Sequence, residues 1–80
     1  MRWWFIKLNE NERMIEYAYS RETKDYDGRI VYSKIDKVAR MAKPSETDEG
    51  SKRLETQSLS HFYGQVVNEG FPDERYVCCG

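Results

Sequence analysis

Long apolar runs are missing from this sequence of 80 residues. The longest uninterrupted run of strongly apolar residues covers residues 3–6, whereas a membrane-spanning helix needs about 20, so we expect no membrane segment. Residues 2–8 also lack the apolar stretch of a signal peptide, because Arg2 and Lys7 flank the aromatic residues. We therefore expect a cytoplasmic protein that does not bind a membrane.

Cysteine and histidine are also scarce. Cys78 and Cys79 are adjacent, so they close no useful loop and provide no disulfide framework, which favours a reducing compartment. Together with the single histidine, His61, they fall short of the four ligands of a structural zinc site. The sequence contains no glycine-rich phosphate loop, no GxSxG and no HExxH motif. We therefore expect a non-catalytic protein with no metal and no cofactor.

What the chain does contain fits one small domain, residues 1–80, with a thin core. Hydrophobic residues make up 39% of the chain and aromatic residues 14%, more than a disordered tail carries, although 34% of the residues are charged. The net charge of −1 conceals an asymmetry: residues 1–43 hold ten basic and seven acidic residues, and residues 44–80 hold three and seven. This asymmetry serves either to bind an acidic partner or to hold the two halves of the chain together.

Apolar residues alternate along the first third of the chain, as they do in half-buried strands. Residues 2–8 and 13–20 both alternate, on either side of a polar turn. Asp27-Gly28 marks a second turn before a third β-prone run. The pattern predicts a three-stranded antiparallel meander over residues 2–32.

The apolar period then changes to that of helices. Ser33 is a candidate cap, Pro44 is a stop, and apolar residues recur between them at helical spacing, which predicts a short helix over 33–43. An acidic linker follows at 44–50, or else the first turn of the next helix with Ser45 and Asp48 as a capping box.

A longer helix is predicted over residues 51–69. Its core-facing residues share an arc of about 140° at 100° per residue; they are Leu59, Phe62, Tyr63, Val66 and Val67. Gly70, Phe71 and Pro72 mark its end, and residues 75–79 read as a last strand. The predicted architecture is an α+β domain of order β-β-β-α-α-β, with two helices on one face of a small antiparallel sheet.

The strand at 2–8 poses a packing problem, because both of its faces are apolar. If Trp4, Ile6 and Leu8 face the helices, Trp3 and Phe5 point to the side of the sheet where polar residues are expected. The opposite register only exchanges the two sets. One apolar face therefore needs a cover, which is another segment of this chain, a second copy in a homodimer, or another molecule. Our first candidate for a protein-interaction surface is Trp3 and Phe5 with Tyr17 and Tyr19.

A second candidate surface lies on the outer face of the long helix. This face is polar but almost uncharged, and its candidate contacts are Gln57, His61, Gly64 and Gln65. Gly64 costs about 1 kcal/mol relative to alanine in a helix interior. Close approach by another backbone explains this composition, and so does chance. His61 is expected to be solvated.

A basic ridge is predicted on the short helix. Lysine and arginine recur there every three residues, at Lys34, Lys37, Arg40 and Lys43. Such a ridge contacts phosphates in nucleic-acid-binding proteins, while sheet aromatics stack on bases. An ordinary solvated face also explains the ridge, and a pI of about 5.8 argues against nucleic acid. Our main hypothesis is a small protein-interaction module that binds itself or another chain, and nucleic-acid binding is the alternative.

Overall fold

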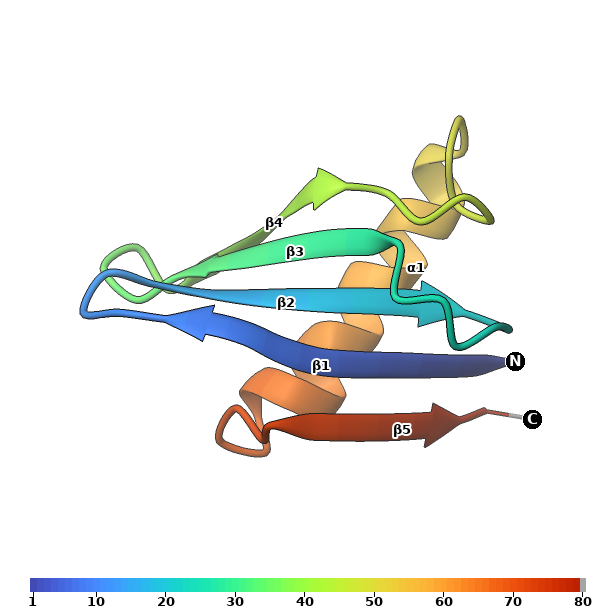
Figure 1. The fold of residues 1–80 in the computed structure, drawn as a ribbon. Coiled ribbons are helices and arrows are strands. Elements are labelled where there is room, and N and C mark those ends of the chain that lie inside the picture. Colours follow the sequence, from blue (N-terminus) through green and yellow to red (C-terminus); the bar gives the residue numbers. More distant parts are fainter. Residues whose placement is uncertain (80) are drawn as a thin grey trace.

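The computed structural model describes residues 1–79, which form one antiparallel sheet and one helical segment. In chain order the elements are β1 (Arg2–Glu10), β2 (Met14–Arg21), β3 (Gly28–Ser33), β4 (Val38–Lys43), α1 (Lys52–Phe62), the π-helical turn η1 (Tyr63–Val67) and β5 (Glu74–Cys78). The strand order is β4-β3-β2-β1-β5. Figure 1 shows α1 crossing behind the sheet from the side of β4 to that of β5. The architecture is α+β, as the sequence predicts, with one helix instead of two. None of the helices within residues 1–79 is long and apolar enough to cross a membrane.

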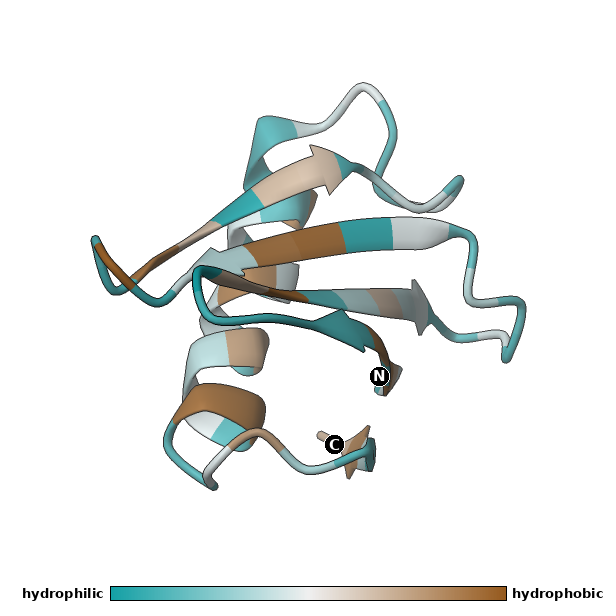
Figure 2. Cartoon of the chain, turned by 60° about the vertical axis from the view of Figure 1, so that its left-hand side comes forward, coloured by the Kyte–Doolittle hydropathy of each residue, from teal (hydrophilic) through white to brown (hydrophobic). Residues whose placement is uncertain are grey.

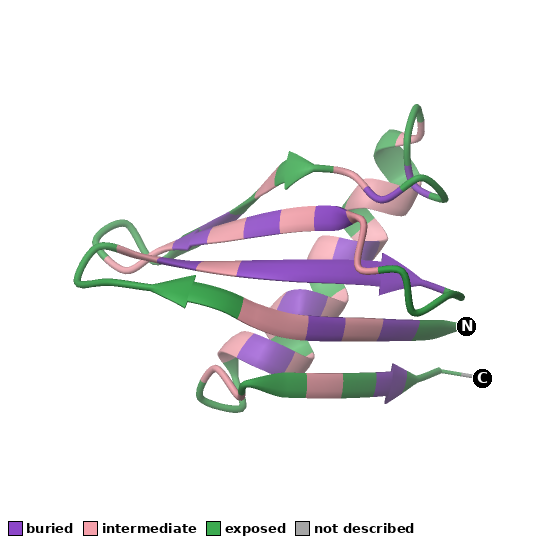
Figure 3. Cartoon of the chain, in the orientation of Figure 1, coloured by how far each residue is buried: buried purple, intermediate pink, exposed green. Residues whose placement is uncertain are grey.

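The register of β1 is opposite to the one we favoured from the sequence. Trp3 and Phe5 are fully buried on the side of α1, so the prediction that they point outward is wrong. Figure 3 shows the resulting alternation of burial along β1. Lys7 shares the inner face with both rings. Its ammonium group reaches the carboxylates of Glu10, at 3.0 Å, and Asp73, at 3.7 Å, so a lysine is accommodated at the margin of an apolar face.

The predicted helix over 33–43 is wrong, because these residues form the turn and second strand of a β-hairpin. The hydrogen bond expected of a helix cap does form: Asp36 N–H donates to Ser33 Oγ at 3.1 Å. Lys37 N–H then donates to the Ser33 carbonyl, but the positive φ of Lys37, 59°, turns the chain out of the helix after one turn. β4 pairs with β3: Val38 lies opposite Ser33 at one end of the pairing, and Lys43 lies opposite Arg29 at the other.

The long helix is confirmed, as α1 continued by η1. Ser51 caps it, because its Oγ accepts the N–H of Leu54 at 3.2 Å. The hydrogen bond from Asn68 N–H to the Tyr63 carbonyl spans five residues and widens the last turn into π geometry. Gly70, with φ of 80°, ends the helix as predicted.

The core lies between α1 and the inner face of the sheet, which Figure 2 shows as two layers. Phe62 packs edge-on against Tyr17 and Phe5, with ring centroids 5.2 and 5.8 Å apart. Phe62 and Val66 are fully buried, and the other residues of the predicted arc pack partly buried against the same core. The predicted core-facing arc is therefore confirmed.

The segment 44–50 does more than link β4 to α1. Ser45 and Asp48 are 1% and 0% exposed. Asp48 N–H donates to the Ser45 carbonyl, and Ser45 N–H donates to the hydroxyl of Tyr19 at 2.9 Å, so the segment folds inward. The alternative prediction of a capping box made by Ser45 and Asp48 is wrong, because Ser51 is the cap.

Candidate protein-interaction surface

Helix α1 covers one side of the sheet, and the other side, which we call the open face, carries the outward side chains of all five strands. The strand register shows which apolar residues lie on the open face; they are Trp4, Ile6, Met14, Ala18, Val31, Val38 and Tyr76. Val38 is 52% and Tyr76 51% exposed. Leu8, at the bulge of β1, is 48% exposed. A sheet face in contact with water normally carries polar side chains, so this face is unusually apolar.

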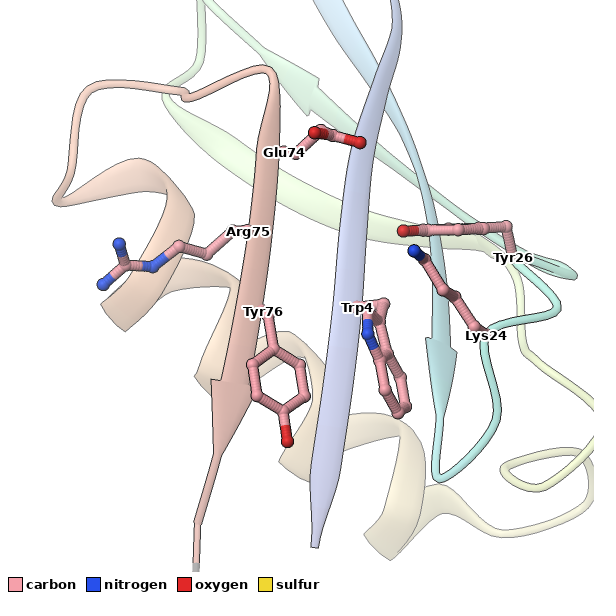
Figure 4. Close-up of a pocket in the computed structure, with 6 residues that line it drawn as sticks. All are labelled: Trp4, Lys24, Tyr26, Glu74, Arg75 and Tyr76. Atoms are coloured by element: carbon pink, nitrogen blue, oxygen red, sulfur yellow. The ribbon is translucent and has the colours of Figure 1, made fainter.

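Aromatic side chains gather at one end of the open face. The rings of Trp4 and Tyr76 lie 5.2 Å apart, tilted by 39°. Figure 4 shows Tyr26 and Lys24, from the loop after β2, reaching toward Trp4, with Glu74 at one end. Burial, with Glu74 nearby, raises the pKa of Tyr26 and keeps its hydroxyl neutral. The hollow between these residues has a volume of about 190 Å³. Small-molecule sites start near ~300 Å³, so this hollow suits one anchoring side chain of a partner better than a cofactor.

The open face carries charges on all five strands, including Arg2 on β1 and Glu16 on β2. Arg29, Arg40 and Lys43 lie on β3 and β4, and Glu74 lies on β5 at the opposite edge. The Arg29 guanidinium is held by the carbonyls of Tyr26 and Gly28, at 2.7 and 2.8 Å. Within residues 1–79, Arg40, Lys43 and Glu74 make no ion pair. The edge strand β4 is therefore basic on the open face, and the opposite edge strand β5 carries one carboxylate, that of Glu74.

The inner face contains a buried polar network, which the sequence pattern did not predict. Arg21 Nε lies 2.9 Å from Asp48 Oδ1, an ion pair without hydrogen-bond alignment, and the two side chains are 5% and 0% exposed. Asp48 Oδ2 accepts the hydroxyl protons of Tyr19, at 2.8 Å, and Ser58, at 2.6 Å. Burial raises the pKa of Tyr19 to about 12. Because solvent does not reach this network, it serves the fold and is no candidate site.

The structure does bring the four aromatic candidates Trp3, Phe5, Tyr17 and Tyr19 together, but on the inner face. Each is 0% exposed. Trp3 Nε1–H donates to Ser58 Oγ at 2.9 Å, and the hydroxyl of Tyr17 donates to the carbonyl of Pro72. Their placement on an outer surface is corrected: they are core residues, and the outward-facing aromatic residues are their sequence neighbours.

Two of the helix candidates are engaged within the chain. Gln57 Oε1 accepts from Arg21 at 2.8 Å, and Gln65 Oε1 accepts from Arg75 at 2.9 Å. Gly64 is exposed, and a Cβ atom placed on it would meet nothing within 4 Å. No backbone of this chain approaches Gly64 in the part that the structure describes, so a role in binding a partner stays a prediction.

His61 is half-buried and not freely solvated, which corrects the expectation. Its ring stacks on Trp3, with centroids 3.9 Å apart and planes 27° apart. Burial, together with the nearby charge of Arg21, lowers the pKa of His61. The imidazole therefore acts as a neutral cover over the indole.

The basic ridge does not exist as predicted, because its residues are on a hairpin and not on a helix. Lys34 pairs with Glu10 at 2.7 Å, and Lys37 sits in the turn. Arg40 and Lys43 lie on the exposed side of β4, on the open face. Only these two of the four cations share a surface with the aromatic residues.

No metal or cofactor site emerges from residues 1–79, where no three His, Cys, Asp or Glu side chains converge. Cys78 and Cys79 are free and exposed at the end of β5. No protein-family model matches the chain, and comparisons with curated proteins and with solved structures give no significant match. The function is therefore argued from the surfaces of the chain itself.

The residues missed at the sequence level are the outward members of the edge strands and loops. Tyr76, Tyr26 and Glu74 lie far apart in sequence from Trp4, and only strand order brings them together. A partial signal existed for Trp4, because the opposite register of residues 2–8 places it outside. No sequence pattern predicted the burial of Asp48, because it lies in the acidic segment 44–50.

Proposed function

We propose that this protein is a small non-catalytic interaction module that binds protein through the open face. The supporting observation is that Tyr76 and Val38 are exposed, and Trp4 is half-buried beside Tyr76, on a sheet face that no second layer covers within residues 1–79. Apolar side chains that gather on an exposed face, as Trp4 and Tyr76 do, mark contact sites in soluble domains. Tyrosine and tryptophan are also the residues that most often dominate interface energies.

The composition of the open face favours protein over nucleic acid. Ile6, Val31 and Val38 also lie on this face, and their aliphatic side chains suit the apolar side chains of a protein. Two carboxylates, of Glu16 and Glu74, lie on the same face and offset part of the positive charge of Arg29, Arg40 and Lys43, which weakens the attraction for a phosphate backbone. The free cysteines fit a reducing cytoplasm, which we include in the proposal.

The test is sedimentation of the wild-type chain and of Trp4→Ala over a range of concentrations, at low and high salt. If Trp4 is an anchor, its truncation weakens association by about 2 kcal/mol or more, roughly thirtyfold. Burial of apolar surface makes this association only modestly dependent on salt.

The matched control is Ile35→Ser. Ile35 is 69% exposed in the turn between β3 and β4, so it is more exposed than any apolar residue of the open face. Association that Ile35→Ser weakens as much as Trp4→Ala contradicts the proposal. Binding of a single-stranded oligonucleotide that falls steeply as salt rises would instead favour the nucleic-acid alternative.

A further inference from the structure

We infer that the open face is built to stack on the open face of a second copy, about a two-fold axis that runs parallel to β2. This inference rests on the proposed function and names the partner. It starts from the strand order, in which β2 is the middle strand of five. A half-turn about an axis along β2 places β4 of one copy over β5 of the other, and β3 over β1.

The charges on the open face fit this rotation. One row of the sheet runs straight across all five strands, and its members are Glu74, Ile6, Ala18, Arg29 and Lys43. With Ala18 on the axis, the rotation brings Lys43 over Glu74 of the other copy and Arg29 over Ile6. The symmetry repeats each pair, so a dimer gains two Lys43–Glu74 ion pairs.

Both residues, Lys43 and Glu74, have a charge that is left without an ion-pair partner within residues 1–79. They lie on opposite edge strands of the sheet. The guanidinium of Arg29 donates to the carbonyls of Tyr26 and Gly28 in its own copy. The aliphatic part of the Arg29 side chain therefore remains to pack against Ile6 of the other copy. An edge-to-edge pairing of strands would leave Lys43 and Glu74 without these partners.

The middle of the row permits close approach. Ala18, on the axis, has a short side chain that adds little height, and it is 1% exposed. Stacked sheets pack about 10 Å apart, a distance that lysine and glutamate side chains bridge. A stable interface needs about 800 Å² from each copy, roughly one sixth of the 4986 Å² that this chain exposes.

One residue opposes the dimer, and it supplies a second test. Glu16 lies on β2, two residues from Ala18 on the same face, so the rotation brings it close to Glu16 of the other copy. Like charges facing each other weaken association. Glu16→Gln should therefore tighten the dimer, by about threefold or more.

The decisive experiment is charge reversal, read by sedimentation and by native mass spectrometry. Lys43→Glu alone and Glu74→Lys alone each create two repulsive pairs per homodimer, so each should weaken self-association roughly tenfold to a hundredfold. An equimolar mixture of the two single variants should form a heterodimer, because every pair in it is again attractive. The double variant Lys43→Glu/Glu74→Lys should recover the homodimer.

Urea unfolding of each variant checks that the fold is kept. A dimer that Trp4→Ala weakens but charge reversal leaves unchanged overturns this two-fold arrangement and keeps the proposed function. A dimer that resists both changes overturns the arrangement and the proposed function together. If the wild-type chain is monomeric at every concentration, the inference that its partner is a second copy is refuted.

Discussion

Asp48→Asn removes the carboxylate that pairs with the buried guanidinium of Arg21. The two groups are 2.9 Å apart at 0% and 5% exposure, so water cannot replace the lost charge. Removing one partner of a buried ion pair costs about 3–5 kcal/mol, because the other charge remains desolvated. A chain of this length has a free energy of unfolding of about 4–12 kcal/mol in total. The variant should therefore lose at least about a quarter of its free energy of unfolding.

A double-mutant cycle in urea separates this charge effect from packing. Arg21→Met keeps an apolar stem against Trp3, over which the guanidinium carbon lies at 4.7 Å. The double variant Arg21→Met/Asp48→Asn should lose less stability than the two single variants summed, by about 2 kcal/mol. The control is Glu69→Gln, which breaks the exposed pair with Arg75 and should cost less than about 1 kcal/mol. Strictly additive losses, or a loss in Asp48→Asn no larger than in the control, would refute the reasoning.

Three further predictions concern single positions, each read from urea unfolding. The pKa of His61 is lowered in the folded state, so the stability that His61 contributes is present above the ordinary pKa of 6.5 and is lost as pH falls through the lowered pKa. His61→Phe keeps a ring on Trp3 and should remove this loss of stability at low pH. An unchanged dependence of stability on pH in His61→Phe would contradict the assignment. Gly28→Ala should cost about 1–3 kcal/mol, because its Cβ would lie 2.2 Å from the Tyr19 ring, and a neutral result would contradict the packing. Gly64→Ala should stabilise the fold by about 0.5–1 kcal/mol, since the site is open, and a loss of stability would show a contact that the chain itself does not explain.

The long helix and the first hairpin followed from the sequence because local and tertiary preferences agree there. The apolar arc around Phe62 and the glycine at position 70 both indicate the same element, and both were confirmed. The prediction for the residues of β4 was wrong for the opposite reason, because their local preference and their tertiary pairing disagree. Its residues, Val38–Lys43, include alanine, arginine, methionine and lysine, which favour helices, and Ser33 makes the hydrogen bond of a helix cap. Pairing with β3 overrides that preference, and no local pattern reports it.

The register of residues 2–8 illustrates why the candidate surface was displaced by one residue. Alternation predicted two apolar faces correctly, but the choice between them depends on which face the helix covers. A shift by one residue exchanges every side chain between core and surface, so Trp3 and Trp4 exchanged roles. The polar network around Asp48 lay beyond sequence reasoning, because it joins residues from β2, the segment 44–50 and α1.

The central claim is that the open face is the surface through which copies of this chain associate. A dilution series of amide spectra by NMR, from millimolar to micromolar protein, tests it most directly. The account predicts concentration-dependent shifts at Ile6, Ala18 and Val31, and none at Ser60 or Gly64 on the exposed side of the helix. Shifts confined to the helix, or spectra that do not change with concentration, would contradict it.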